Sequence, residues 1–191
     1  ILLFILFVVL FSFSYKKLKE SDLKQIVATL RNDPLPVNPM DEVKQQLSEW
    51  AKQEQLQSQI DIVKKEDSVS IEIKDKVFFS SGEYELSPVG LNRIKTLAKT
   101  LEKLPAKLRL GIEDHTDDIP IHTKQIQDNW DLSAKRALNV LYALELSQEL
   151  LKRTQVIAQG EMNPLVPNRD KNGNSVPENQ NKNRRVTIKV F

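Results

Sequence analysis

Hydrophobic and polar residues alternate along four short stretches after residue 68. In the first of them, Val69, Ile71 and Ile73 are separated by polar residues. Such alternation is typical of a β-strand that buries one of its faces. The four stretches are residues 69–73, 108–112, 156–158 and 186–190. The pattern therefore predicts four strands.

Between these strands, apolar residues recur at the spacing of amphipathic helices. They are Leu91, Ile94, Leu97, Ala98 and Leu101 in one stretch, and Ala137, Val140, Leu141 and Leu144 in a second that begins near Leu132. The resulting order is β-α-β-α-β-β. It predicts an α+β fold, a two-layer sandwich with helices packed on one sheet. We expect one domain over residues 68–191.

The start of the chain is apolar from Ile1 to Phe13, beginning ILLFILFVVL. Spanning a bilayer takes roughly 20 apolar residues, so we expect residues 1–18 to be the C-terminal part of a single transmembrane helix. A signal peptide would need a basic start and a small-residue cleavage site, and this stretch has neither. Lys16, Lys17 and Lys19 follow, and the positive-inside rule alone would place this end in the cytoplasm.

Residues 19–31 form the next segment. Ser21 is a suitable N-cap for a short amphipathic helix. Its narrow apolar stripe consists of Leu23, Ile26, Val27 and Leu30. The stripe suits either a simple connector helix beside the membrane or a segment that docks on lipid or on a partner.

Residues 32–67 are predicted to connect this segment to the domain. The stretch NDPLPVNPM, from Asn32 to Met40, is rich in proline and cannot be helical. Residues 41–58 are rich in good helix formers, and Val43, Leu47 and Trp50 mark an apolar face. We therefore expect a linker followed by a helix.

Composition excludes several classes of function. The formal net charge is +2, so bulk electrostatics do not indicate a nucleic-acid partner. The chain has no cysteine, which excludes disulfides, thiol catalysis and zinc–thiolate sites.

Both histidines of the chain lie in EDHTDDIPIH, residues 113–122, together with several carboxylates. A zinc site needs three or four converging ligands, and His115 and His122 have no third His or Cys to join them. Paired carboxylates can catalyse hydrolysis, but no nucleophile or oxyanion donor accompanies these. Aspartates that follow a strand are commonly turn formers. The pattern therefore favours neither a metal site nor an enzyme, and it predicts no cofactor.

The long polar loop at residues 163–183 contains Asp170, Asn172 and Asn174, an arrangement similar to a calcium-binding loop. Its glycine, Gly173, is misplaced for such a loop, and Asn181 occupies the position of the bidentate glutamate. The sequence predicts a solvated loop.

Ligand recognition by charge pairing remains as an interpretation of the acidic cluster. Asp117 lies in the predicted turn, and Arg136 lies in the first or second turn of the following helix. A carboxylate and a guanidinium on the two sides of a groove would suit a zwitterion. The alternative is that the two residues only pair with each other on the surface, which is worth about 0–1 kcal/mol.

Four motifs extend this interpretation: FFSSGEYELSPVG, EDHTDDIPI, NWDLSAKRALNV and NKNRRVTIKV. In this order and spacing, they resemble the OmpA-like peptidoglycan-binding domain over residues 68–191. The form NWxLSxxRA, preceded by an apolar helix, is similar to the MotB branch of that family, the B subunits of ion-driven stator units.

The resemblance implies a site for diaminopimelate, a residue of the peptidoglycan stem peptide. Asp117 and Arg136 match the family positions that hold its free amino-acid end. The other matching positions are Thr116, Asn129 and Leu132, which shape the groove, and Arg184 and Arg185 of the NRRV element. Asp114 departs from the family, which usually has glycine there. A glycine would permit a positive φ or a close backbone approach, and the aspartate adds a negative charge that could alter affinity.

The resemblance also implies partners and a location. Proteins of the MotB branch are homodimers that bind a MotA-like A subunit in the bacterial inner membrane, with the C-terminal domain in the periplasm. Their ion-carrying aspartate would fall before Ile1, and residues 19–31 lie where they have a plug against ion leakage. A Zorya-type anti-phage motor uses the same parts, and a general envelope anchor uses the domain without a motor.

Overall fold

The structure is a computed structural model of the chain and describes residues 4–5, 8, 30–31 and 38–191. The chain divides into two compact units, Ile1–Pro39 and Met40–Phe191. Most of the predicted membrane segment (residues 1–18) and of the predicted plug (19–31) lies outside the described residues. Leu30 is described and is 81% exposed, whereas Leu23, Ile26 and Val27 are not described. Within the described ranges, none of the helices has both the length and the apolar character needed to cross a membrane.

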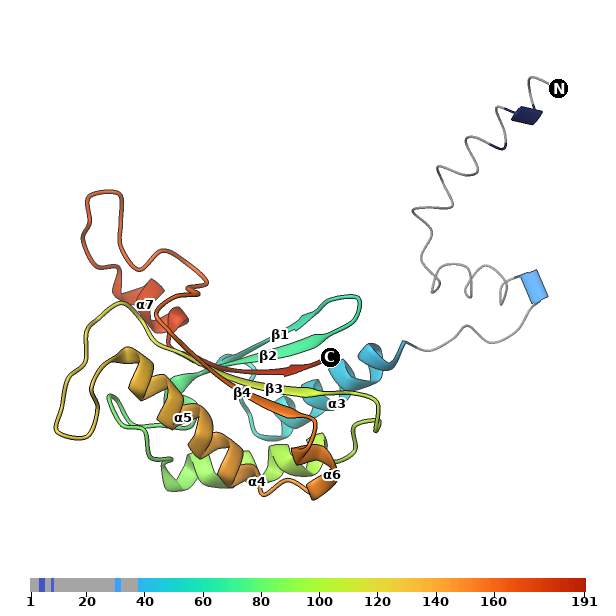
Figure 1. The fold of residues 1–191 in the computed structure, drawn as a ribbon, viewed down its shortest axis with the longest axis horizontal. Helices are drawn as coiled ribbons and strands as arrows, with labels where there is room; N and C mark the ends of the chain where they lie inside the picture. Colours follow the sequence, from blue (N-terminus) through green and yellow to red (C-terminus); the bar gives the residue numbers. More distant parts are fainter. Residues whose placement is uncertain (1–3, 6–7, 9–29, 32–37) are drawn as a thin grey trace. The chain divides into compact units, whose positions relative to one another are not determined.

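The second unit is built on a five-stranded sheet of order β1-β2-β5-β3-β4 (Figure 1). Its strands are β1 (Ile60–Lys64), β2 (Val69–Lys74), β3 (Leu110–His115), β4 (Thr154–Gly160) and β5 (Arg185–Val190). Only β3 and β4 pair in parallel, and all other neighbours are antiparallel. The parallel pair follows from the chain path, because a helical crossover joins β3 to β4.

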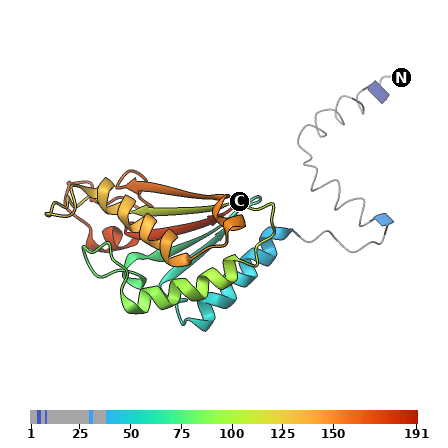
Figure 2. The same ribbon diagram turned by 60° about the horizontal axis from the view of Figure 1, so that its bottom comes forward.

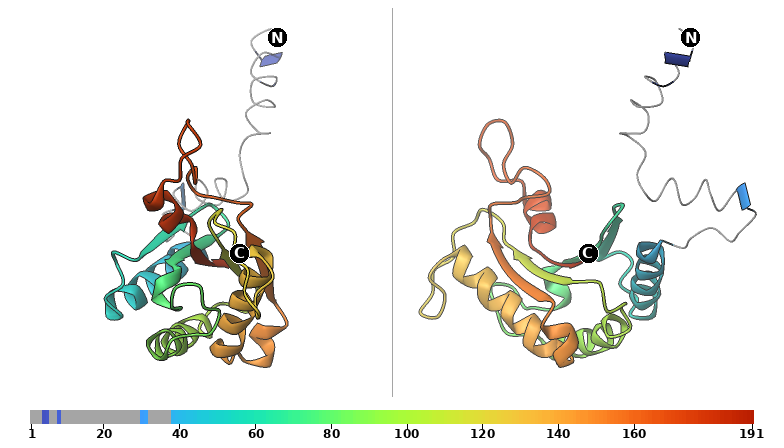
Figure 3. Two further views of the ribbon diagram at one scale, coloured as in Figure 1. Left: turned by 90° about the vertical axis from the view of Figure 1, so that its left-hand side faces the viewer. Right: turned by 45° about the vertical axis from the view of Figure 1, so that its right-hand side comes forward.

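Three long helices cover one face of the sheet, as Figures 2 and 3 show. They are α3 (Pro39–Gln53), α4 (Pro88–Leu101) and α5 (Asn129–Leu144). Shorter helical segments are η1 (Asp75–Val77), α6 (Gln148–Leu151) and α7 (Pro177–Asn183). From β2 to β5 the main elements follow the predicted order, so the α+β class and the arrangement of helices on one sheet are confirmed.

Alternation along the strands places the core between sheet and helices. Ile188 on β5 is in register with Ile71 on β2 and with Ile112 on β3, and all three are fully buried. Side chains at every second strand position share a face, so this row continues along the sheet. β-Branched residues pack well on such a pleated surface.

Local signals set the starts of α4 and α5. The Ser87 side chain accepts a hydrogen bond from the backbone N–H of Gly90, and Pro88 is the first residue of α4. The Asp128 side chain accepts from the backbone N–H of Asp131 at 2.8 Å. Both are standard N-caps, which satisfy donors that the first helical turn leaves free.

The compact unit begins earlier than the boundary expected at residue 68. β1 pairs with β2 along its whole length, and α3 contributes Val43, Leu47 and Trp50 to the core. Trp50 also donates a hydrogen bond from Nε1 to Thr96 Oγ1 on α4 at 3.0 Å. The predicted helix at 41–58 ends at Gln53, shortly before Gln55 adopts a φ of 57°. Residues 40–67 therefore form part of the domain rather than a linker to it.

Candidate ligand-binding pocket

A pocket of about 300 Å³ lies where β3 ends and α5 begins. Its walls come from the loop after β3, the first turns of α5, η1, the turn at residues 81–82 and the residue before β5. Six of the seven residues that the sequence predicts for the ligand site line it: Thr116, Asp117, Asn129, Leu132, Arg136 and Arg184. The fold thus brings together residues from motifs far apart in the sequence.

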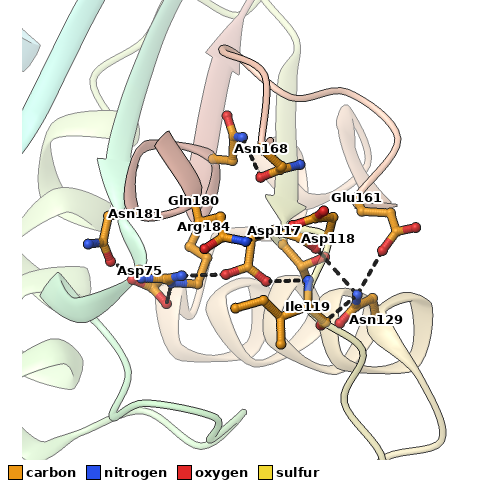
Figure 4. Close-up of polar contacts among 12 residues, drawn as sticks. Asp75, Asp117, Asp118, Ile119, Asn129, Glu161, Asn168, Gln180, Asn181 and Arg184 are labelled. Atoms are coloured by element: carbon orange, nitrogen blue, oxygen red, sulfur yellow. Dashed lines mark hydrogen bonds and ion pairs between the residues drawn. The ribbon is translucent and has the colours of Figure 1, made fainter. Parts of the chain in front are cut away.

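Charged side chains of alternating sign run along the pocket, and Figure 4 shows three of them, Asp75, Arg184 and Asp117. Asp117 Oδ2 accepts a hydrogen bond from Arg184 Nη1, and Arg184 Nε lies 3.7 Å from Asp75 Oδ2. The same Asp75 oxygen lies 3.5 Å from Arg136 Nη1. Asp117 and Arg136 are therefore linked through Arg184 and Asp75, and the simple surface pair considered from the sequence is not what the structure shows.

Arg136 is 1% exposed, and its guanidinium is fixed by several contacts. Nε donates to the carbonyl oxygen of Glu83 at 2.8 Å, and the guanidinium carbon lies 4.8 Å from the centre of the Phe79 ring. An arginine carries five N–H donors in a fixed plane. The contacts to Glu83 and Asp75 use only part of this set, so the group is held in place and can still donate to a ligand.

Asp117 is presented by a turn that other predicted residues hold. Its Oδ1 accepts from the backbone N–H of Ile119 at 3.1 Å. Asn129 Nδ2 lies within hydrogen-bonding distance of the carbonyls of Asp117 (3.3 Å) and Ile119 (3.1 Å) and of Glu161 Oε2 (2.9 Å). Thr116 Oγ1 donates to the Asp117 carbonyl at 2.9 Å. Thr116 and Asn129 therefore act on the backbone that positions Asp117.

Arg185 is the one residue predicted for the ligand site that does not line this pocket. Neighbouring residues of an extended chain point to opposite faces of a sheet, so Arg184 and Arg185 diverge. Arg185 is buried and donates to the carbonyls of Asn183 (3.0 Å) and Asn163 (3.1 Å). Burial lowers the pKa of its guanidinium. These contacts attach the loop after β4 to the sheet, so the geometry gives Arg185 a structural role.

Asp75 is the charged residue of the pocket that sequence reasoning missed. It follows β2 directly and is the first residue of η1. Its carboxylate lies within ion-pair distance of both Arg136 and Arg184. The available signal was a carboxylate directly after the alternating strand. Its pairing with Arg184, however, depends on the end of β2 lying beside the end of α7.

Asp114 is fully buried, and neither oxygen of its carboxyl group has a hydrogen-bond partner. Burial raises the pKa of this group well above its ordinary value, and Arg136 opposes that rise. Asp114 lies in β3, in register with Val186, and is not among the described non-glycine residues of positive φ. The substitution of the usual glycine therefore changes buried charge rather than backbone conformation.

The histidines do not converge on a common site. His115 Nε2 lies 3.6 Å from Glu113 Oε2, and a hydrogen bond from His115 lowers the pKa of Glu113. His122 is exposed, with Nδ1 3.0 Å from the carbonyl of Gln127. Within the described ranges, no group of three or more His, Cys, Asp or Glu residues is placed to hold a metal ion. In the polar loop, the Asp170 carboxylate accepts hydrogen bonds from Asn172 and Asn174, as in a turn.

Comparison with known proteins agrees with this geometry. Residues 78–184 match the model of the OmpA family. The chain is 30% identical to Motility protein B of Bacillus subtilis (strain 168) over 153 residues. This match covers 80% of the chain and 56% of the Bacillus protein, so the chain spans little more than half of that relative.

Two solved structures share the fold. A protein described as MotB-like from Desulfovibrio vulgaris matches with a TM-score of 0.65 and 26% identity, covering 79% of this chain and 94% of that one. The cell wall anchor of the T6SS from Pseudomonas aeruginosa matches with a TM-score of 0.64 and 23% identity, covering 76% and 96%. The second likeness, at its lower identity, concerns the fold alone.

Proposed function

The chain belongs to the OmpA family, and from this premise we propose that its domain is a peptidoglycan anchor that binds the free amino-acid end of diaminopimelate. The observation that carries the proposal is the pocket in which Asp117, Arg184, Asp75 and Arg136 alternate in charge. An amino-acid end carries an ammonium and a carboxylate. The pocket offers a held partner for each.

The expected binding mode follows from the chemistry of the two groups. The ammonium of diaminopimelate donates to Asp117, and its carboxylate accepts two parallel hydrogen bonds from Arg136. The ligand competes with two internal contacts of the pocket, that of Arg184 with Asp117 and that of Asp75 with Arg136. Leu132, Ile119 and Pro120 supply the apolar wall for the methylene chain between the two ends of the ligand.

At the level of the whole protein, we propose a MotB-like B subunit that anchors an ion-driven stator unit to the cell wall. In this role the chain is a homodimer, binds a MotA-like membrane A subunit and has no catalytic activity. Peptidoglycan lies outside the inner membrane, so the domain works in the periplasm below a single membrane helix. The 30% identity to a motility protein supports this role.

A second candidate is supported by the likeness to the T6SS cell wall anchor, since that protein has the same fold. A general envelope anchor would use the same pocket without a motor, and a Zorya-type defence motor would use it with one. Co-purification with a MotA-like subunit separates the motor roles from the general anchor.

The binding proposal is tested by sedimentation of the full chain, in mild detergent, with purified sacculi. Asp117→Asn removes the negative charge expected to bind the ammonium and keeps the shape of the side chain. Arg136→Lys keeps the positive charge and removes the planar pair of donors expected to bind the carboxylate. Loss of a desolvated charge pair costs about 2–5 kcal/mol, so we expect at least about 30-fold weaker retention. Asp118→Asn is the matched control, because the Asp118 carboxylate contacts Arg169 and Gln180 and lies outside the pocket.

Sacculi that carry lysine in place of diaminopimelate provide a ligand control, since lysine lacks the second carboxylate. We expect the wild-type chain to bind lysine sacculi as weakly as the Arg136→Lys variant binds diaminopimelate sacculi. Full retention of the folded Asp117 and Arg136 variants would refute the site.

We also propose that residues 19–31 act as a plug, through Leu23, Ile26, Val27 and Leu30. Deletion of Lys19 to Leu30 should raise ion influx when the protein is produced together with its A subunit. Unchanged influx would rule out a plug.

A further inference from the structure

Asp114 is fully buried, its carboxyl group has no hydrogen-bond partner, and it lies two residues before Thr116, which lines the pocket. It lies on the helix-covered face of β3, because it shares this face with the core residues Leu110 and Ile112. Burying an ionised carboxylate without hydrogen bonds is very costly, so such a group stays protonated or draws a cation toward it. An unsatisfied buried carboxyl therefore calls for a physical explanation.

The charged groups around Asp114 come from three elements. Arg136 on α5 favours the ionised form of Asp114, Asp75 on η1 opposes it, and Arg185 on β5 favours it. On the remaining side, the register partner on β4 is Ala158, which carries no charge. Arg136 is thus the cation that Asp114 and a ligand in the pocket would share.

We propose that Asp114 is a positioning residue of the pocket: as a neutral acid it leaves the charge of Arg136 to a ligand carboxylate, and as a carboxylate it competes for that charge. This inference rests on the proposed recognition of a zwitterion. It adds that recognition is coupled to a proton held by the buried carboxyl group of Asp114.

Charge balance explains the coupling. With Asp114 neutral, Arg136 and Arg184 balance Asp75 and Asp117, and a zwitterionic ligand enters a neutral pocket. Ionisation of Asp114 adds one negative charge beside Arg136 and disfavours the ligand carboxylate. By linkage, a bound carboxylate disfavours ionisation of Asp114, so binding above the pKa of Asp114 takes up a proton.

The first test measures binding of free meso-diaminopimelate to the full chain between about pH 4.5 and 9. We expect the dissociation constant of the wild type to rise about tenfold or more as Asp114 ionises, within the usual range of coupling between two sites. Asp114→Asn is a neutral isostere and should keep the low-pH affinity across the whole range. It retains both histidines, so any pH dependence left in this variant belongs to other groups.

The second test needs no ligand. The Nε–H of Arg136 is buried and bonded to the carbonyl of Glu83, so its NMR signal should be protected from exchange. In the wild type this signal should shift with pH as Asp114 titrates, and the inflection should be absent in Asp114→Asn. Asp114→Gly provides a second neutral variant if the asparagine does not fold.

The outcomes separate the two proposals. Absence of binding by the wild type at every pH, with an Arg136 titration that disappears in Asp114→Asn, would refute the ligand but keep the coupling. Coincident pH profiles of the wild type and the neutral variants, in binding or in the Arg136 signal, would overturn the role of Asp114. A folded Asp114→Asn that binds more than tenfold weaker at every pH would also overturn it.

Discussion

Arg184 donates a hydrogen bond to Asp117, although 67 residues separate them in the sequence. The pair joins the loop after β3 to the residue before β5 and places a cation on the carboxylate proposed to bind the ligand ammonium. Asp117 is therefore preorganised by an internal partner that has the same charge as the expected ligand group. This relationship makes Arg184 both a support for the pocket and a competitor of the ligand.

Arg184→Gln should destabilise the fold, because it leaves the largely buried Asp117 carboxylate without its cation. Removing one partner of such a pair costs about 1–3 kcal/mol. Urea unfolding of Arg184→Gln, Asp117→Asn and the double variant measures the coupling energy. We expect the double variant to be less destabilised than the sum of the two single variants; strict additivity would contradict the pairing.

Periodicity predicted the elements whose pattern was long or regular. The alternation of Val69, Ile71 and Ile73 identified β2, and the apolar spacing after Ser87 identified α4. β1 was missed because its five residues lie at the sheet edge, where exposure of Asp61 and Val63 weakens the contrast between faces. The packing of α3 on the sheet is a tertiary contact, which hydrophobic periodicity within one segment does not predict.

The main charged residues of the pocket could be predicted from the sequence, but the ion pairs that they form with one another could not. The resemblance of the four motifs to the OmpA-like domain, rather than their spacing alone, assigned Asp117, Arg136 and Arg184 to one site. The partner of each arginine depends on the pairing of β2 with β5, which places Asp75 beside Arg184. Arg185 was assigned with its neighbour because a motif does not say which face each residue occupies.

The buried carboxyl of Asp114 should lower stability as pH rises. Its pKa is raised in the folded state and is about 3.9 in the unfolded chain. Between these two values the folded state holds a proton that the unfolded state has lost, so unfolding becomes easier with increasing pH. The advantage of the neutral acid is complete below about pH 4 and is lost as pH rises toward the folded pKa.

Asp114→Asn has no carboxyl group to ionise at this position, so it should lack this loss of stability with rising pH. Urea unfolding at several pH values from 4 to 9 should show Asp114→Asn gaining stability relative to the wild type as pH rises. A constant difference between the two proteins over this range would show that the group ionises in the folded state as it does in the unfolded chain.

Gly90→Ala should destabilise the domain. A Cβ at this position would lie 2.3 Å from the carbonyl oxygen of Phe78, a backbone atom that cannot rotate away. Forced overpacking of this kind costs about 1–3 kcal/mol. Thermal unfolding measures the loss, and Gly82→Ala, where no atom lies within 4 Å but φ is +75°, separates steric overlap from backbone strain. Equal stability of Gly90→Ala and the wild type would mean that α4 and Phe78 can separate at no cost.

Arg185→Lys and Arg184→Lys should affect different properties, although the two residues are adjacent: the first the protease resistance of the loop, the second the binding to sacculi. Arg185 attaches Asn163 and Asn183 to the sheet through two carbonyls, and a lysine cannot donate to both in the plane of a guanidinium. We expect Arg185→Lys to speed proteolysis within residues 163–183 severalfold and to leave binding to sacculi by the folded protein unchanged. Arg184→Lys should change binding while the loop stays as resistant as in the wild type. Limited proteolysis and sedimentation of the same samples measure both effects. Loss of binding in Arg185→Lys, with the loop intact, would return Arg185 to the ligand site that the NRRV motif first indicated.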